Sequence, residues 1–201
     1  MTQDHFAGDD RTHWQRMLDG DPYIAEGPEF AEHSKRAARL ADQYHRAVVA
    51  DDPGARGVLE ELLGGLGDGA DVRPPLFVDY GWRISIGARS FVNIGLTALD
   101  VAPITIGEDC QLGPNVQLLT PTHPVEPGPR RDKVEAAEPI TLGDNVWLGG
   151  GVIVCPGVTI GDNTVVGAGS VVTKDLPANV IAVGSPAKAV RELPAQDDER
   201  P

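Results

Sequence analysis

Aromatic residues are scarce in this sequence, at 5% of 201 residues, whereas valine, isoleucine and leucine are plentiful. This composition argues against a broad core built on rings and favours a narrow column of branched aliphatic side chains. Only two cysteines are present, Cys110 and Cys155, and neither has neighbours typical of a disulfide, a metal site or a nucleophile. We expect both to be small buried side chains in a reducing, cytoplasmic setting.

Basic residues are few as well, because 17 lysines and arginines face 30 aspartates and glutamates, for a net charge of −13. This balance argues against non-specific binding to nucleic acid or to an anionic membrane surface. No apolar run is long enough to span a bilayer, and no signal-peptide pattern opens the sequence. We therefore expect a soluble protein with neither a membrane nor a nucleic acid as partner.

Histidine is sparse too: of the five in the chain, only His123 lies beyond the first quarter. A zinc site built from three converging histidines has no candidates in that larger part, so we expect no metal. Gly167-Ala168-Gly169 lacks the third glycine of a dinucleotide-binding fingerprint, and no Gly-x-Ser-x-Gly elbow indicates a hydrolase serine. Turn glycines are the simpler interpretation of the first motif.

What the sequence does contain is a repeat of six residues. An amphipathic helix would space its apolar residues by three and four, and an ordinary strand by two. A six-residue period indicates a parallel β-helix, whose units each supply a short strand and a turn and stack into one aliphatic column. The recurring residues are Ile106, Leu112 and Leu118 in a first set, then Leu142, Leu148, Val154, Ile160, Val166 and Val172.

The remaining segments are arranged around this repeat. Apolar residues spaced by three and four predict a helix over 28–49, and a second helix begins near Asp52 or Pro53. Strands are expected from Leu76 to about Val183. We therefore predict a disordered tail (1–12), an N-terminal helical segment (13–70), a β-helix (71–185) with an excursion loop (119–139), and a short C-terminal helix with a tail (186–201).

The excursion loop is the first place to expect function, since long loops on a rigid repeat scaffold usually carry it. His123 lies in this loop with Pro121 and Pro124 close by, and these prolines stiffen the backbone around it. Imidazole titrates near neutral pH in general, so it suits the removal of a proton from an alcohol. The alternative is a surface histidine without a role.

Several short motifs in this chain, taken together, are similar to those of a known protein family. They are Asp79-Tyr80-Gly81, Leu99-Asp100-Val101-Ala102-Pro103, Gly113-Pro114-Asn115-Val116, Thr122-His123-Pro124, Asn145-Val146-Trp147, Pro156-Gly157-Val158-Thr159, Gly167-Ala168-Gly169-Ser170 and Gly184-Ser185-Pro186-Ala187. In these motifs the chain resembles the maltose and galactoside O-acetyltransferases, a subgroup of the hexapeptide acyltransferases, from about Trp14 to Leu193. The resemblance implies a left-handed parallel β-helix, and a homotrimer whose active sites lie between subunits.

The resemblance also implies roles for individual residues. His123 matches the catalytic base, and Asn93 matches an asparagine that contacts the acceptor and the transition state, a contribution of about 3 kcal/mol for one such donor. Asp79 matches an acceptor-binding position, and Asp100 and Glu135 are further candidates for the same pocket. From the residues alone, a turn asparagine and solvated loop carboxylates are the alternatives.

The donor would be acetyl-CoA, used as co-substrate and bound beside the C-terminal coils. Trp147 would wall its pantetheine arm or, alternatively, pack at a trimer interface. Gly150 and Ala168 match backbone contacts to that arm. The phosphate and adenine end is matched by Thr173, Lys174, Lys188 and Arg191. The three cations among them gather near the C-terminus of an acidic chain, which favours an anion site.

The activity that the resemblance implies is direct transfer of an acetyl group, in a ternary complex, to a hydroxyl of a maltose- or glucose-like sugar. Ala25, Ser34 and Val101 stand where the galactoside enzyme has charged residues that hold its sugar, which argues against a galactoside as acceptor. Two alternatives stay open. One is an acyltransferase of the same fold acting on an amine, an antibiotic or a lipo-oligosaccharide, and the other is a non-catalytic module that uses the β-helix as a rigid prism.

Overall fold

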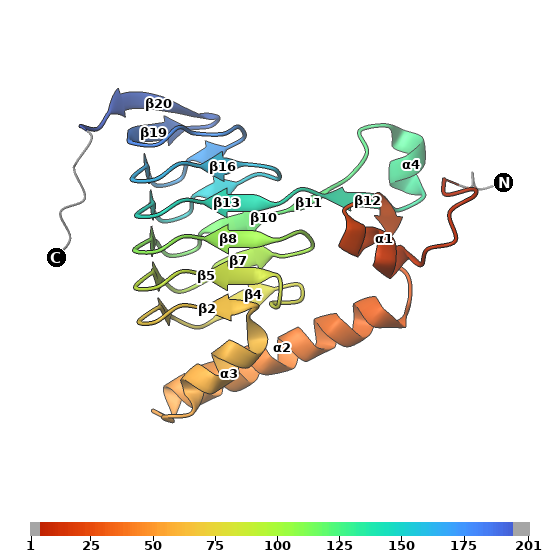
Figure 1. Cartoon of the computed structure of the whole chain (residues 1–201), viewed down its shortest axis with the longest axis horizontal. Helices are drawn as coiled ribbons and strands as arrows, with labels where there is room; N and C mark the ends of the chain where they lie inside the picture. The colour runs from red at the N-terminus through yellow and green to blue at the C-terminus, as the bar shows by residue number, and fades with distance from the viewer. Residues whose placement is uncertain (1–4, 195–201) are drawn as a thin grey trace.

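A triangular prism of short parallel strands makes up most of the molecule (Figure 1). The computed structural model describes residues 5–194. Each coil of the chain contributes one strand to each of three sheets in turn, and strands of successive coils pair in parallel. The parallel solenoid confirms the fold predicted from the six-residue repeat, while its handedness stays a prediction.

We number the three sheets as faces 1 to 3, in the order in which each coil visits them. Face 1 contains β2 (Gly65–Leu66), β5 (Ile84–Ile86), β8 (Ile104–Ile106), β13 (Ile140–Leu142) and β16 (Thr159–Ile160). Face 2 contains β3 (Asp71–Val72), β6 (Phe91–Val92), β9 (Gln111–Leu112), β14 (Trp147–Leu148), β17 (Val165–Val166), β19 (Val180–Gly184) and β20 (Ala187–Glu192). Face 3 contains β4 (Leu76–Val78), β7 (Leu96–Leu99), β10 (Gln117–Leu119), β15 (Ile153–Val154) and β18 (Val171–Val172).

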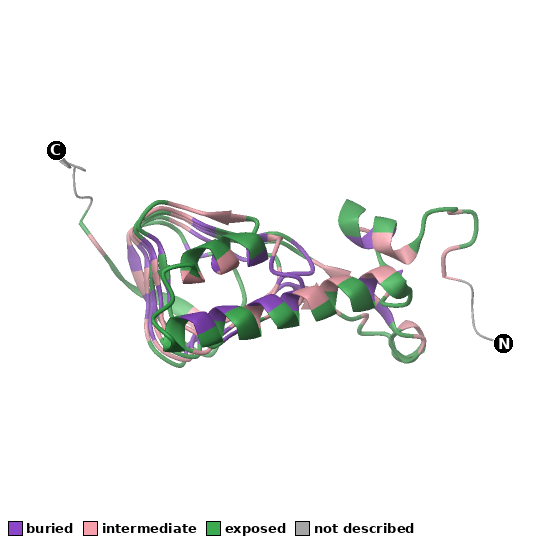
Figure 2. Cartoon of the chain, turned by 90° about the horizontal axis from the view of Figure 1, so that it is seen from below, coloured by how far each residue is buried: buried purple, intermediate pink, exposed green. Residues whose placement is uncertain are grey.

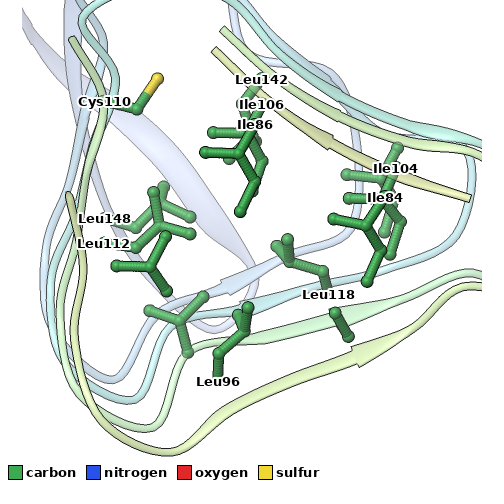
Figure 3. Packing of buried hydrophobic residues seen from close by; sticks show 14 of the residues in the cluster. Ile84, Ile86, Leu96, Ile104, Ile106, Cys110, Leu112, Leu118, Leu142 and Leu148 are labelled. Atoms are coloured by element: carbon green, nitrogen blue, oxygen red, sulfur yellow. The ribbon is translucent and has the colours of Figure 1, made fainter. Parts of the chain in front are cut away.

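The core is a column of aliphatic side chains inside the prism. Ile86, Ile106 and Leu142 stack on one another because the parallel register places them side by side in successive coils (Figure 3). Since side chains alternate along a strand, the residue between two buried ones points outward. On face 1 these outward positions hold only small or polar residues, which are Gly65, Ser85, Thr105, Thr141 and Thr159.

The N-terminal helices α2 (Pro28–Val49) and α3 (Ala55–Leu62) close one end of this column (Figure 2). Leu40, Tyr44 and Leu62 belong to the same buried cluster as the prism core. The Tyr44 hydroxyl donates a hydrogen bond to the carbonyl of Val72 in the first coil. The helix over 28–49 is thus confirmed, and its apolar face covers coil ends that would otherwise be open to water.

A small antiparallel sheet stands away from the prism, beside the helices. It consists of β1 (Tyr23–Ile24), β12 (Val134–Ala137) and β11 (Pro121–Thr122), in that order. The two latter strands and α4 (Pro127–Arg131) all lie in the excursion loop. The chain therefore leaves the column as predicted, but the loop has regular structure that the sequence pattern did not indicate.

The β region begins earlier than predicted. Gly65–Leu66 already forms a strand of the first coil, six residues before the predicted boundary at residue 71. The glycines around this strand are required by close packing between coils. A Cβ added to Gly64 would lie 2.1 Å from the Trp82 carbonyl oxygen, and one added to Gly67 would lie 2.3 Å from the Ala88 nitrogen.

The predicted C-terminal helix is wrong. Residues Ala187–Glu192 form β20, which runs antiparallel to β19. Since β19 is the last parallel strand on face 2, its free edge offers unpaired backbone groups, and the returning chain pairs with them. Residues 195–201, predicted as part of the tail, lie outside the described residues.

The predicted N-terminal tail also differs from the structure. Residues 1–4 lie outside the described part of the chain, but residues 5–12 pack against α1 (His13–Asp19) and the excursion loop. His5 is 2.9 Å from the carboxylate of Asp132, and Arg16 lies over the ring of Phe6 while it pairs with Asp9. These contacts order a segment whose composition alone is that of a polar tail. Among the described residues, none of the helices is both long and apolar enough to span a membrane.

Candidate active site

His123 stands at the tip of β11, in the excursion loop that leaves the prism where face 3 turns into face 1, hereafter the 3–1 corner. Thr122 is paired with Ala136, and His123 follows at the end of this ladder, on the side of Glu135. On the other edge of β12, Tyr23 is paired with Glu135. Residues opposite one another on neighbouring strands point to the same side. The register therefore sets Tyr23 beside Glu135, and His123 comes just after the last pair on the other edge of β12.

Tyr23 is the functional candidate that the sequence analysis missed. Its side chain is 1% exposed, and its hydroxyl donates a hydrogen bond of 3.0 Å to Oε2 of Glu135. The ring stacks on Phe30 of α2, with centroids 5.6 Å apart and planes 11° apart. Tyr23 belongs to no segment with a regular spacing of apolar residues. It is a candidate only because β1 pairs with β12, which lies more than a hundred residues away in the sequence.

Asp100 organises the turn that holds Asp79. Its side chain is fully buried, and Oδ1 accepts hydrogen bonds from the backbone N–H groups of Asp79 and Tyr80, at 3.0 and 2.8 Å. Oδ2 accepts another from the Arg83 N–H at 3.3 Å. Burial raises the pKa of Asp100, and these hydrogen bonds oppose the rise. From the resemblance we expected Asp100 as a candidate for the acceptor pocket, whereas its oxygens accept hydrogen bonds from the backbone of the turn that holds Asp79.

Asp79 lies one coil below Asp100 at the same corner and is only partly buried. Burial is the main cause that raises its pKa to about 6, and the neighbouring carboxylates of Asp100 and Glu135 raise it further. Asp100 and Glu135 therefore both lie close enough to Asp79 to raise its pKa. Asp79 and Glu135 therefore form an acidic pair that can accept hydrogen bonds from hydroxyl groups.

Thr120 fixes the base of the hairpin to the prism. Its hydroxyl donates to the Leu99 carbonyl at 2.6 Å and accepts from the Ala102 N–H at 3.0 Å. Because Thr120 is fully buried, these bonds are shielded from water. His123 is thus carried on a strand whose origin is rigid, although the imidazole itself is exposed.

Four of the other predicted site residues are not at this corner. Asn93, Gly150 and Ala168 lie where face 2 turns into face 3, hereafter the 2–3 corner, and Trp147 points outward from face 2 with 54% of its surface exposed. The Oδ1 of Asn93 accepts the N–H of Ile94 at 2.8 Å, which leaves the amide nitrogen as the donor for a ligand.

The basic candidates are spread along the upper coils. Thr173 and Lys174 lie at the 3–1 corner, above the excursion loop, and Lys188 and Arg191 lie on β20 at the end of face 2. All four are exposed. A single chain therefore gathers His123 with the acidic residues, and keeps Asn93 and Trp147 on another side of the prism. Within residues 5–194, no group of three or more metal-ligating side chains could hold a metal ion.

Comparisons with known proteins agree with this architecture. Residues 139–174 match the bacterial transferase hexapeptide model (six repeats), and residues 16–67 match the maltose acetyltransferase hexapeptide capping motif. The galactoside O-acetyltransferase of Escherichia coli K12 is 39% identical over 83% of this chain and 82% of its own length.

Two solved structures extend the likeness to the whole fold. A maltose O-acetyltransferase from Clostridium difficile 630 is 37% identical with a TM-score of 0.89, over 92% of this chain and 99% of its own. A hexapeptide-repeat acetyltransferase from Vibrio cholerae O1 biovar eltor, complexed with acetyl coenzyme A, is 33% identical with a TM-score of 0.83, over 92% and 100%. The protein is therefore an acetyltransferase and belongs to the maltose and galactoside O-acetyltransferase family of hexapeptide-repeat enzymes.

Proposed function

We propose that this acetyltransferase moves the acetyl group of acetyl-CoA to a hydroxyl of a sugar, with His123 as the general base. The observation that carries the proposal is the position of Glu135, bonded to Tyr23 on the strand that pairs with β11 just before His123, with Asp79 nearby. Carboxylates that accept hydrogen bonds from several hydroxyls suit a polyol, and an imidazole next to them is placed to deprotonate one of those hydroxyls.

The chemistry follows from these groups. The imidazole of His123 takes the proton of the acceptor hydroxyl as its oxygen attacks the thioester carbonyl. The tetrahedral intermediate carries a negative charge on the former carbonyl oxygen, which the amide N–H of Asn93 stabilises. The intermediate then collapses, the carbon–sulfur bond breaks, and the thiolate of coenzyme A takes up the proton from the imidazolium. The products are the acetyl ester and free coenzyme A.

A second copy of the chain would bring His123 and Asn93 together. The two residues belong to different corners of one prism, so one protomer's 3–1 corner would meet its neighbour's 2–3 corner. Exposed apolar side chains support this arrangement, because Phe77 on face 3 is 57% exposed and Trp147 on face 2 is 54% exposed. Face 1 presents only small or polar residues. A homotrimer repeats one such contact three times and closes on itself.

Acetyl-CoA would lie along this contact. The outward ring of Trp147 would wall the pantetheine arm, and Gly150 and Ala168 would let it approach the backbone. The phosphates would meet Lys174, Lys188 and Arg191, which are exposed cations in a chain with a net charge of −13. The complex of the Vibrio cholerae enzyme with acetyl coenzyme A supports this choice of donor.

The acceptor side favours a glucose- or maltose-like sugar. Ala25 and Ser34 cannot form ion pairs, and Val101 packs in the small aromatic cluster that contains Tyr23. Glu135 and Asp79 are then the groups left to bind the ring hydroxyls, and both reach the site from the same corner as His123.

The test is release of thiol from acetyl-CoA with a panel of sugars, amines and aminoglycosides. We expect turnover with a glucose-containing sugar, and a drop of about a hundredfold or more in His123→Ala, with the mass of the assembly unchanged. His45→Ala, which removes an exposed histidine of α2, is the matched control and should remain active. Turnover with amines alone would support an N-acyltransferase, and a fully active His123→Ala would refute the base assignment.

A further inference from the structure

The N-terminal segment is built into the same small sheet that carries the catalytic hairpin. Tyr23–Ile24 forms its outer strand and pairs with Glu135 and Val134 of β12. The β12 strand in turn pairs with β11, which ends one residue before His123. A displacement of β1 would therefore change the position of both the acidic residue and the imidazole.

The tyrosine ring has little freedom to move. It is 1% exposed, stacks on Phe30 of α2, and lies in a cluster with Met17, Tyr80 and Val101. Its hydroxyl has one hydrogen-bond partner in the described structure, Oε2 of Glu135 at 3.0 Å. Burial, and after it the charge of Glu135, raises the pKa of Tyr23 well above its usual range, so the hydroxyl keeps its proton.

The backbone before Tyr23 is fixed as well. Arg16, which is buried in α1, donates from Nε to the carbonyl oxygen of Pro22 at 2.7 Å. Its Nη1 pairs with the carboxylate of Asp9. The residue immediately before Tyr23 is thus held by a charged hydrogen bond, which is stronger than a neutral one.

We propose that Tyr23 is a positioning residue of the acceptor site, which holds the Glu135 carboxylate so that its other oxygen, Oε1, faces the sugar beside His123. This inference rests on the proposed function. A carboxylate without such a partner would rotate among several side-chain orientations, and ordering it on binding would weaken the affinity for the acceptor. Because the Tyr23 side chain is 1% exposed, acetyl-CoA should not contact this hydrogen bond.

The test is Tyr23→Phe, which removes one hydroxyl and keeps the ring and its packing. We expect KM for the sugar to rise about tenfold, with KM for acetyl-CoA unchanged within twofold. Tyr44→Phe is the matched control, because Tyr44 is also a buried tyrosine with one hydrogen bond, to the carbonyl of Val72 in the helical cap. It should leave both KM values at their wild-type level.

A double-mutant cycle separates positioning from a general loss of structure. In Glu135→Ala the group that accepts the tyrosine hydrogen bond is already gone, so adding Tyr23→Phe should change the sugar KM less than twofold. This inference alone would be overturned if the sugar KM of the double variant rose by the product of the two single-variant increases. Equal sugar KM values in wild type and Tyr23→Phe would overturn it as well. A wild type that releases no thiol with any sugar would overturn the proposed function, and this inference with it.

Discussion

At the scale of single residues, the carboxylates near the 3–1 corner differ in their burial and in their hydrogen-bond partners. Asp100 is fully buried, and its oxygens accept backbone N–H groups of the turn that contains Asp79. Asp79 is left partly exposed above this turn, and Glu135 is tied to Tyr23 from the other side. The three carboxylates thus have different environments, because the number of hydrogen-bond donors around each one differs.

The environment of Asp79 predicts a dependence of stability on pH. Its pKa is raised from 3.8 to about 6, so the folded chain binds this proton more tightly than the unfolded chain. Its contribution to stability is present below pH 4 and is lost as pH rises to 6. Asp79→Asn removes the cost of the buried charge, and we expect a gain on the order of 1–3 kcal/mol at pH 7.5 and little gain at pH 4.

Thermal unfolding at the two pH values measures this gain, with Asp10→Asn at an exposed aspartate as the matched control. The same variant should bind the sugar less well, since an amide replaces the acceptor carboxylate. A gain of equal size at both pH values would contradict the assigned cause.

At the scale of elements, the turns between strands are built as repeating units. Asn145, Asn163 and Asn179 occupy equivalent turns between faces 1 and 2, each with a positive φ. Their side chains form a ladder, with Asn145 donating to Asn163 at 2.9 Å and Asn163 donating to Asn179 at 3.0 Å. Asparagine suits these positions because it tolerates the left-handed conformation and can also bond to the next coil.

Substitution of the middle asparagine tests this account. Asn163→Ala and Asn163→Gly both lose the ladder, but only alanine is strained at a φ of +58°. We expect the alanine variant to be less stable than the glycine variant by roughly 1 kcal/mol, because the strain outweighs the larger chain entropy of glycine. Denaturant unfolding compares the stability of the two variants. Equal midpoints would show that strain in the left-handed backbone conformation does not destabilise the alanine variant.

At the scale of the whole molecule, the three faces of the prism differ in their outer surfaces. Face 1 is lined by serine and threonine, whereas faces 2 and 3 expose Trp147 and Phe77. We infer that these two faces contact another copy of the chain, since each exposes a large apolar ring. Together with the separation of His123 from Asn93, this distribution is the reason to expect that the active enzyme is an oligomer.

Phe77→Asp tests this expectation on face 3, with Thr105→Asp on the polar face 1 as the matched control. We expect the wild type and the control to have the mass of three 21.3 kDa chains in sedimentation, and Phe77→Asp to have a lower mass and little activity. A trimeric Phe77→Asp would place the interface elsewhere.

The sequence by itself determined the column and the helical cap. The aliphatic residue at every sixth position can be buried only if the chain coils with that period, and the spacing over 28–49 fits one helix, α2 (Pro28–Val49). The motif Thr122-His123-Pro124 lies in a loop outside the prism, and the prolines of this segment indicated such a loop. These features are local, so the pattern of nearby residues was enough to find them.

Only the tertiary structure decided which distant residues meet. Tyr23 contacts Glu135 because β1 pairs with β12, and neither strand belongs to the six-residue repeat. Asp100 holds the backbone of a turn because three N–H groups donate hydrogen bonds to its carboxylate. The final segment is the strand β20 and not a helix, since the open edge of β19 was available to pair with it. Long-range hydrogen bonds and burial produce these contacts. Neither requires a regular spacing of residues, so the sequence pattern does not reveal them.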